Sequence, residues 1–438
     1  MFDRTFLSIS KPISKIISKI ISQIISQITS KLILKGISYH LGYGLLFLVV
    51  SMGVITGCGG QNPEANKAEE PNVKKESSLV FQEVTLEKFD DNGQPLWKVN
   101  AQKVVYGQDK KIANVTKPKG NLFQDGKVVL QVEAEQGQIF DDGKQILLNG
   151  KIIAIDPRNQ AVLKGDKLQW KPEESMLIMQ ENLTGNNSQL QFSARIGRYF
   201  TKEQKLELQG QVVAVVKEPP LRMQSRYIQW LIPQEKINSD RILQISHYQK
   251  QDGSPNSQTN LQLTPDPNSK NPPPKLLQKV ESEQVEYDLK TKVAILKKNV
   301  QLNSIEPPAQ AVSNNITWNI IEETVLSPET IKIVQVKDQL TVTGNQGLLN
   351  LKTKIADLVG GVQAISDRNQ STVFANQMQW NLETQALQAT GNVIYQQVNP
   401  ALKVVGSEAA GKLNTENIVV TGTKNPGGQV ITEIIPKE

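Results

Sequence analysis

The chain has few side chains that are suited to chemistry. Its 438 residues include one cysteine, Cys58, and two histidines, His40 and His247. A disulfide framework, a structural zinc site and a Cys/His catalytic pair each need more of these residues than the chain contains. The sequence therefore predicts no metal site and no cofactor.

Two carboxylate pairs, at residues 141–142 and 173–174, invite a general acid/base hypothesis. The first pair precedes Gly143 and the second follows Pro172, and both contexts are typical of turns. The acidic run at residues 90–93 lacks the spaced oxygen ligands of a calcium loop, so we expect a hairpin turn there. No phosphate-binding glycine loop followed by Lys and Ser or Thr occurs. We therefore expect a protein that is not an enzyme.

Cys58 ends a segment with the layout of a secretory signal peptide. Basic residues precede the apolar run 45–50, and Ile-Thr-Gly at residues 55–57 stands directly before the cysteine. This resembles the bacterial lipobox, in which the cysteine is lipidated and becomes the mature N-terminus, so Cys58 is the expected lipid anchor. The apolar stretch 41–57 is marginal for a membrane-spanning helix, and an uncleaved single-span anchor stays open. An incidental match stays open as well.

The basic charge of the chain is concentrated in this leader. Residues 1–57 contain six basic residues and one acid, a net +5 of the chain's formal +6. The pI of about 9.0 thus reflects the leader, and we expect no nucleic acid partner. Isoleucine-rich tetrads from Ile13 to Ile28 indicate a low-complexity leader extension, an overextended gene start or a basic amphipathic helix. After Cys58, the polar residues 59–78 are typical of a flexible tether.

From Leu79 onward the sequence is typical of β-structure. Apolar and polar residues alternate, as at residues 97–101 and 128–134, which is the pattern of strands with one buried face. Turn residues such as Asn149-Gly150 separate these runs. No window of a dozen residues beyond the leader has convincing helical periodicity. The fold class predicted is all-β.

Two motifs recur along the β-region. Four of the five tryptophans follow an apolar residue and a polar one, at Trp170, Trp230, Trp318 and Trp380. A second motif places a glycine between apolar residues: Gly360, Gly391 and Gly422 are 31 residues apart, and Gly150 and Gly210 are 60 apart. A unit of about 30 residues is two long strands with their turns, and such hairpins must stack to bury their apolar faces.

In this order and spacing, the motifs resemble the lipopolysaccharide-transport β-jellyroll of the LptC family, which LptA (OstA-like) proteins share. The resemblance covers residues 79–233 well and residues 275–438 more weakly, through repetition of the same unit. It implies an antiparallel, twisted β-jellyroll, elongated and repeated in two lobes or in one continuous stack. Both the length after the tether and the lipobox-like anchor depart from the family pattern of one short anchor and one jellyroll, which leaves the mode of attachment open.

Prolines divide the β-region. The triplet Pro272 to Pro274 and further prolines among Asn, Gln and Ser favour an extended linker or a long loop. A short hairpin using Ile242 to Tyr248 and Asn260 to Leu263 stays possible there, and His247 is expected to be solvated. The expected parts are an anchor at 1–57, a tether at 58–78, a first lobe at 79–235, the linker at 236–275 and a second lobe at 276–438.

The resemblance also implies a function. The protein would lie in the periplasm, anchored to the inner membrane, receive lipopolysaccharide from an inner-membrane ABC transporter and pass it along an apolar groove to another periplasmic jellyroll protein. The candidate groove residues, which also suit an ordinary core, are Val99, Ala101, Leu130, Val132, Ile146, Leu148, Ile152 and Phe192. The candidate edge-strand contacts to the partner jellyroll are Val84, Leu86, Ile418 and Val420.

Two alternatives stay open. The first is a structural cell-envelope lipoprotein whose jellyroll is a fully packed sandwich, and which binds protein or cell-wall polymer without transporting lipid. The second, more remote alternative is a polysaccharide-degrading β-solenoid enzyme. Lipopolysaccharide adducts at inward positions would separate the transport hypothesis from the first alternative.

Overall fold

The computed structural model describes residues 79–107, 110–250, 261, 263, 274–412, 415, 417–422 and 430–434. The chain divides into two units, Met1–Val73 and Lys74–Glu438, and every described residue belongs to the second unit. The predicted anchor, the tether and Cys58 lie outside the described residues.

The first eleven strands lie within residues 79–216. They are β1 (Leu79–Phe89), β2 (Pro95–Tyr106), β3 (Ile112–Thr116), β4 (Lys119–Gln124), β5 (Lys127–Glu133), β6 (Gln136–Phe140), β7 (Gln145–Asp156), β8 (Ala161–Lys171), β9 (Met176–Asn186), β10 (Leu190–Phe200) and β11 (Lys205–Val216). The short 3-10 helix η1 (Asp141–Gly143) joins β6 to β7.

The remaining strands continue to the end of the described chain, and a second 3-10 helix, η2 (Ile232–Gln234), follows the first of them. They are β12 (Leu221–Leu231), β13 (Lys236–Ser239), β14 (Leu243–Tyr248), β15 (Leu276–Ser282), β16 (Gln284–Asp288), β17 (Val293–Ser304), β18 (Ala309–Asn319), β19 (Thr324–Ser327), β20 (Ile331–Gln335), β21 (Leu340–Gly344), β22 (Gln346–Asn350), β23 (Ile355–Ser366), β24 (Ser371–Asn381), β25 (Leu387–Gln397), β26 (Leu402–Lys412), β27 (Asn417–Thr421) and β28 (Ile431–Ile434). Within the described residues no α-helix occurs, so the all-β prediction is confirmed.

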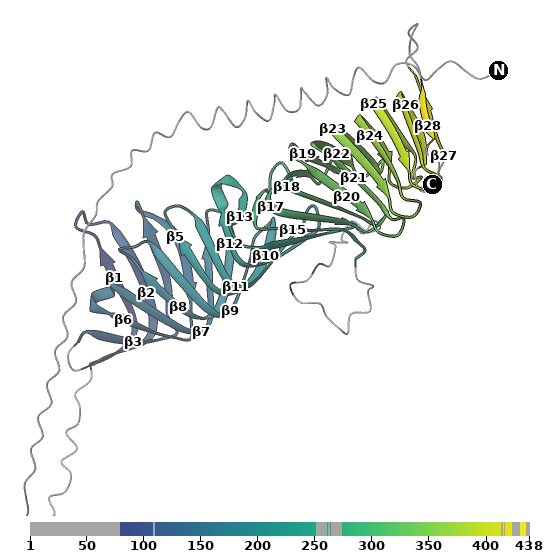
Figure 1. The fold of residues 1–438 in the computed structure, drawn as a ribbon. Helices are drawn as coiled ribbons and strands as arrows, with labels where there is room; N and C mark the ends of the chain where they lie inside the picture. Colours follow the sequence, from purple (N-terminus) through teal and green to yellow (C-terminus); the bar gives the residue numbers. More distant parts are fainter. Residues whose placement is uncertain are drawn as a thin grey trace, which may run out of the picture. The chain divides into compact units, whose positions relative to one another are not determined.

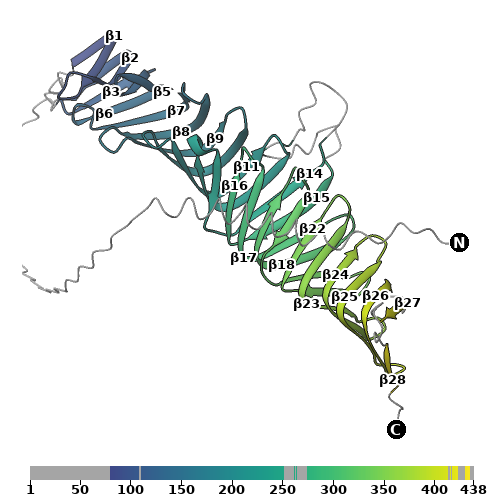
Figure 2. The same cartoon turned by 90° about the horizontal axis from the view of Figure 1, so that it is seen from above.

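The strands pair antiparallel in an order that follows the chain, as Figures 1 and 2 show by the succession of labels and colours from β1 to β28. Long neighbours such as β7 and β8, or β23 and β24, pair along their whole length. All described strands belong to one sheet. The sequence left two lobes and one continuous stack open, and the structure has the continuous form, consistent with a β-jellyroll.

A bulge bends many of the long strands near the middle. In the ladder between β7 and β8, Asn149 pairs with Lys167 but Ile152 pairs with Gly165, so β7 carries one extra residue. Gly150 has a φ of 80° there, in the left-handed region that glycine adopts without strain. The repeated glycines of β11, β23 and β25 have the same conformation, with φ between 76° and 79°. The repeat found in the sequence is therefore the repeat of these corners.

The corners divide the sheet into two arms. Residues 103–106 of β2 pair with β3, whereas residues 97–100 pair with β4, so one strand contributes to both arms. We call the half-strands that carry the repeated tryptophans the tryptophan arm, and the half-strands beyond the corners the opposite arm. The four repeated tryptophans are Trp170, Trp230, Trp318 and Trp380.

The core lies between the two arms. Alternate residues of β7, from Ile146 and Leu148 in one arm to Ile152 and Ala154 in the other, are buried in one apolar cluster that extends along the described sheet. Burying a Leu, Ile or Val side chain stabilises the fold by about 1.5–3 kcal/mol. Each hairpin alone would leave this face exposed, so stacking of successive strands is what makes the fold stable.

Part of the expected linker, residues 236–275, is sheet. Strand β13 pairs with β12 and β16, and β14 pairs with β12 and β15, so the hydrogen-bond ladder continues from β12 to β17. Residues 251–260, 262 and 264–273, which include Pro272 and Pro273 of the proline triplet, lie outside the described part of the chain. The limits of the two lobes stay a prediction.

Candidate functional site

The interior between the arms contains every candidate groove residue. The eight are between 1% and 8% exposed and belong to the same apolar cluster: Val99 and Ala101 of β2, Leu130 and Val132 of β5, Ile146, Leu148 and Ile152 of β7, and Phe192 of β10. The ring of Phe192 contacts Trp230 of the tryptophan arm edge to face, with 6.5 Å between centroids. In this structure the eight form the core, and binding of acyl chains by them stays a prediction.

Each arm ends, away from the corners, in a row of turns. The tryptophan-arm row contains the turns at 172–175, 201–204, 232–235, 289–292, 320–323, 351–354 and 382–385. The opposite-arm row contains the turns at 157–160, 187–189, 217–220, 305–308, 336–339 and 367–370. We call the line along which the two rows contact each other the seam.

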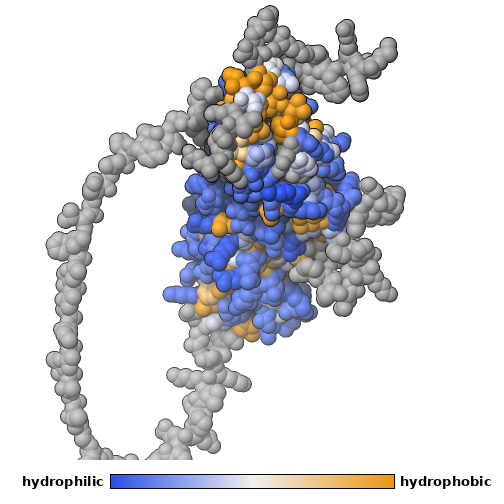
Figure 3. Space-filling model, turned by 45° about the vertical axis from the view of Figure 1, so that its right-hand side comes forward, coloured by the Kyte–Doolittle hydropathy of each residue, from blue (hydrophilic) through white to orange (hydrophobic). Residues whose placement is uncertain are grey.

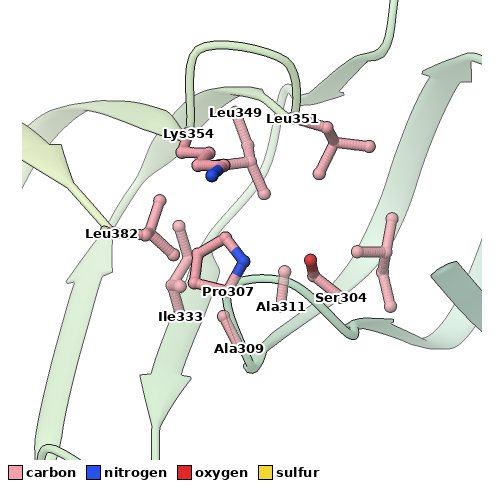
Figure 4. A pocket seen from close by; sticks show the side chains of 10 residues that line it. Ser304, Pro307, Ala309, Ala311, Ile333, Leu349, Leu351, Lys354 and Leu382 are labelled. Carbon is pink, nitrogen blue, oxygen red and sulfur yellow. The ribbon is translucent and has the colours of Figure 1, made fainter. Parts of the chain in front are cut away.

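Two hollows lie between the arms at the seam. Leu130, Asp156, Tyr199 and Trp230 are among the residues that line the first. Figure 4 shows the second, with Leu349, Leu351 and Lys354 on one side and Pro307, Ala309 and Ala311 on the other. Each hollow has a cavity volume of ≈ 10 Å³, which is space for about one water molecule. At both places side chains fill the space between the arms.

A buried charge lies at the first hollow. Asp156, the last residue of β7, is in the opposite arm and is 1% exposed. The hydroxyl of Tyr199, in the tryptophan arm, donates to Asp156 Oδ2 at 2.5 Å, and Arg158 Nη2 donates to the same oxygen at 2.6 Å. Arg158 Nη1 and Nη2 also donate to the carbonyl oxygen of Thr201, each at 3.1 Å. These four residues, the Asp156 cluster, join the two arms.

The environment fixes the protonation of two members of this cluster. Burial raises the pKa of Tyr199, and its hydrogen bond to Asp156 and the charge of that carboxylate raise it further, so the phenol remains a neutral donor. Burial lowers the pKa of Arg158, but its hydrogen bond and charge interaction with Asp156 outweigh burial, and the net shift is upward. The guanidinium therefore stays charged beside the carboxylate.

Amide side chains cross the seam next to this cluster. Asn159 Nδ2 donates to Gln204 Oε1 at 3.3 Å, and Gln189 Nε2 donates to Glu235 Oε2 at 2.7 Å. In both pairs one residue belongs to an opposite-arm turn and the other to a tryptophan-arm turn. The polar contacts therefore recur from one level of the sheet to the next.

In the C-terminal part of the sheet, the seam is closed mainly by neutral groups. Gln335, at the end of β20, is 1% exposed, and its Nε2 donates to the carbonyl oxygen of Leu382 at 2.8 Å. Gln385 Nε2 donates to Gln335 Oε1 at 2.8 Å and to Asp338 Oδ2 at 3.2 Å. We call Gln335, Asp338, Leu382 and Gln385 the amide cluster.

His247 lies between these two regions, and the expectation that it is solvated is wrong. It belongs to β14 and is 8% exposed. Its Nδ1 lies 2.7 Å from Gln278 Oε1, and its ring packs edge to face against Trp318 of the other arm, with 5.9 Å between centroids. Burial lowers the pKa of His247, although the hydrogen bond to Gln278 and the charge of Glu323 act in the opposite direction.

Strands β1 and β27 lie near the two ends of the described sheet, as predicted. Strand β1 pairs with β2 alone, and β27 and β28 each pair with β26 alone, among the described strands. The four candidate contact residues are half-buried and pack against the core: Val84 and Leu86 in β1, Ile418 and Val420 in β27. Their side chains therefore face the interior, and contact with a partner jellyroll at these edges stays a prediction.

Other apolar side chains are exposed at the C-terminal end. Val398, Val419 and Ile431 are between 60% and 66% exposed. Figure 3 shows an apolar patch at the C-terminal end of the described sheet, on a face that is otherwise mostly hydrophilic. At the other end, Phe81 and Phe89 of β1 are 44% and 50% exposed. Both end strands therefore present apolar side chains to solvent.

The acidic pairs lie in turns, as predicted. Residues 141–142 form most of η1, residues 173–174 lie in the turn after β8, and Asp90 Oδ1 accepts hydrogen bonds from the backbone of Asn92 and Gln94 in the β1–β2 hairpin. Among the described residues, no group of three or more His, Cys, Asp or Glu is arranged to hold a metal ion. The same part of the chain has no helix of the length and hydropathy that crossing a membrane requires.

Sequence reasoning did not find the seam residues. Asp156, Arg158 and Gln335 stand at strand ends, where polar residues usually mark solvated turns. The separation of the contacting pairs, between 43 and 47 residues for most of them, is about one and a half repeats. Counting repeats could have shown which turns face each other, but not which side chains are buried.

Comparison with protein families identifies part of the chain. Residues 45–217 match the family model described as LptC: Lipopolysaccharide-assembly, LptC-related, and this match covers less than half of the 438 residues. No curated protein matches the chain. Members of this family are transport and assembly components, and the family is not a known enzyme family. The match indicates a role in lipopolysaccharide transport or assembly in the periplasmic envelope. Residues 45–217, which include β1 to β11, therefore resemble the LptC-related family of lipopolysaccharide-assembly proteins.

Proposed function

We propose that this protein is a membrane-anchored periplasmic component of lipopolysaccharide export. It receives lipopolysaccharide from an inner-membrane ABC transporter and passes it between the two arms toward the outer membrane. It has no enzymatic activity of its own, and the ATP-driven step belongs to the transporter. The acyl chains contact the interior while the sugars remain in water, because each methylene removed from water contributes about 0.8 kcal/mol.

The apolar cluster between the arms is the observation that supports this proposal. It extends without interruption through both arms and includes residues from β2 to β26. In the part of the chain that matches the LptC-related family, it contains all eight candidate groove residues. An apolar interior that spans many strands suits a ligand that moves along the sheet better than a ligand held at one point.

Photo-crosslinking in cells tests the proposal. A photoreactive amino acid at Ile152, which is 1% exposed, should form lipopolysaccharide adducts. The matched control is its neighbour Ile153, which is 38% exposed on the outer side of the same strand and should form few or none. The same comparison applies to Leu130 and the exposed Gln131. Absence of adducts at every inward position would contradict lipid transport.

The structural lipoprotein remains the second candidate, and one observation favours it. The hollows at the seam are too small for an acyl chain, and the interior is packed as in an ordinary β-sandwich. A purely structural protein would keep this packing at all times. It would capture protein or cell-wall polymer on its outer surface, and inward crosslinkers would capture only residues of its own chain.

Attachment to the inner membrane is proposed through Cys58 or through a single span at residues 41–57. Replacement Cys58→Ala, followed by membrane fractionation and metabolic labelling with a fatty-acid analogue, separates the two. Loss of label together with release from the membrane supports the lipoprotein. If the Cys58→Ala variant stays in the membrane fraction and the parent chain takes up no label, the single span is supported.

The partner jellyroll is proposed to extend an end strand of the sheet. An edge strand exposes backbone donors and acceptors that a second chain can pair with. The two ends that carry Val84 with Leu86 and Ile418 with Val420 are the candidates, and each pairs on one side only in the described sheet. Crosslinkers on exposed residues of these strands, Phe81 and Val419, should capture a second periplasmic protein if this proposal is correct.

A further inference from the structure

The contacts across the seam form a series. From the N-terminal side they are Asp156 with Tyr199, Asn159 with Gln204, Gln189 with Glu235, His247 with Trp318, and Gln335 with Leu382. Each joins the opposite arm to the tryptophan arm. None of them belongs to the backbone ladder that holds each arm together, so parting the two arms breaks these contacts and leaves the ladder intact.

The Asp156 cluster is the most heavily bonded member of this series. Its carboxylate accepts from Tyr199 and from Arg158, and the same guanidinium donates to the backbone of Thr201 on the facing turn. Asp156 is 1% exposed, so water does not replace these partners while the arms are together. Asp156 and Tyr199 of this cluster also line the first hollow, together with Leu130 and Trp230 of the apolar interior.

The size of the hollows shows that the interior is closed here. A cavity of ≈ 10 Å³ accepts about one water molecule and no acyl chain. Entry of a chain therefore requires that the arms separate by at least the width of a methylene row. The corners are the places where that movement can be absorbed, because they are bulges with backbone in the left-handed region at Gly150 and Gly210.

We propose that acyl chains enter the interior sideways through the seam, and that the Asp156 cluster is the latch that holds the N-terminal part of the seam closed. The inference rests on the proposed transport of lipopolysaccharide and specifies its route. Cargo separates the two rows of turns, the cluster is broken while the chains occupy the interior, and the latch reforms when they leave. Entry from the open end of the sheet, by threading, is the competing route, and it does not require the arms to part.

A reversible lock across the seam tests this route. Cysteines replace Asn159 and Gln204, whose side chains are hydrogen-bonded across the seam, in the full chain with a photoreactive amino acid at Leu130. Peptide mapping verifies that the new cysteines, and not Cys58, form the disulfide. The matched control is Glu87→Cys with Lys98→Cys, a cross-strand pair of β1 and β2 that does not cross the seam.

The outcomes distinguish this inference from the proposed function. Lateral entry predicts at least tenfold fewer lipopolysaccharide adducts at Leu130 in the oxidised lock, recovery on reduction, and no effect of oxidation on the control pair. Equal adducts in the oxidised and reduced lock overturn lateral entry and leave transport supported. Absence of adducts in the reduced lock and in the control overturns transport, and lateral entry with it.

Discussion

The seam is built differently in the two parts of the sheet. Near β7 and β10 it is closed by a buried carboxylate, a guanidinium and a phenol. Near β20 and β24 it is closed by two glutamine amides, a carbonyl oxygen and the carboxylate of Asp338. The first arrangement lies in the part of the chain that matches the LptC-related family, and the second lies beyond it.

The difference concerns what happens when the contacts break. A buried charge that loses its partner is costly, by about 3–5 kcal/mol, whereas a neutral hydrogen bond contributes about 1 kcal/mol net. The charged cluster therefore favours two distinct states, closed with all partners in place or open to water. The amide cluster can lose a bond at little cost, and it is expected to open more gradually.

The largest effect is expected for Asp156→Ala. The substitution leaves the buried Tyr199 hydroxyl and the partly exposed Arg158 guanidinium without their shared acceptor, and we expect the free energy of unfolding to fall by about 3 kcal/mol. Urea unfolding followed by tryptophan fluorescence measures it. A loss below about 1 kcal/mol would show that water already reaches this carboxylate, and the contrast between the two parts of the seam would disappear.

A smaller effect is expected for Tyr199→Phe. The ring keeps its packing, but the hydrogen bond to Asp156 is lost, which should lower the free energy of unfolding by about 2 kcal/mol because the acceptor is charged. The same variant should form more lipopolysaccharide adducts at Leu130, since the latch is weakened. Fewer adducts than in the parent chain would contradict the latch.

The amide cluster should be less sensitive. Gln335→Met keeps the side-chain volume and removes the bonds to Leu382 and Gln385, and we expect a loss of about 1 kcal/mol. Hydrogen exchange of β20 and β24 should increase locally. A loss as large as that of Asp156→Ala would show that both parts of the seam have the same strength.

The smallest effect concerns pH and His247, between the two parts. Burial holds its pKa below the ordinary value of about 6.5, so protonation favours the unfolded chain. Its contribution to stability is complete above about pH 6.5 and is lost as the pH falls from there toward the lowered pKa. The free energy of unfolding, measured with urea, should differ less between pH 7.5 and pH 5.5 in His247→Phe than in the parent chain. An equal difference in the two proteins would contradict a contribution of His247 to the pH dependence of stability.

Alternation and repeats predicted most of the fold. The period-two pattern gave strands with one buried face, and the glycine and tryptophan motifs proved to be the corners of β7, β11, β23 and β25 and the ends of four long strands. Such patterns are local, and the backbone imposes them wherever one face is buried. The burial of all eight interior candidates follows from the same pattern.

The seam and the middle of the sheet could not be predicted in the same way. Asp156 and Tyr199 are 43 residues apart on different arms, and their contact depends on how far the sheet folds at its corners. The prolines of residues 236–275 favour a linker, but Leu243–Tyr248 forms a strand that carries His247 into the core. Proline content near a segment says little about residues a few positions away.

One distance measurement tests the central claim, that cargo parts the arms. Spin labels at Gln160 and Lys202 report the width of the seam near the Asp156 cluster, because both residues are exposed and lie on facing turns outside the cluster. Labels at Lys337 and Thr384 report the width of the seam in the C-terminal part. Addition of lipopolysaccharide to the full chain should shift the distance between the labels at Gln160 and Lys202 to longer values. An unchanged distance in a sample whose Leu130 crosslinker captures lipopolysaccharide would contradict the account.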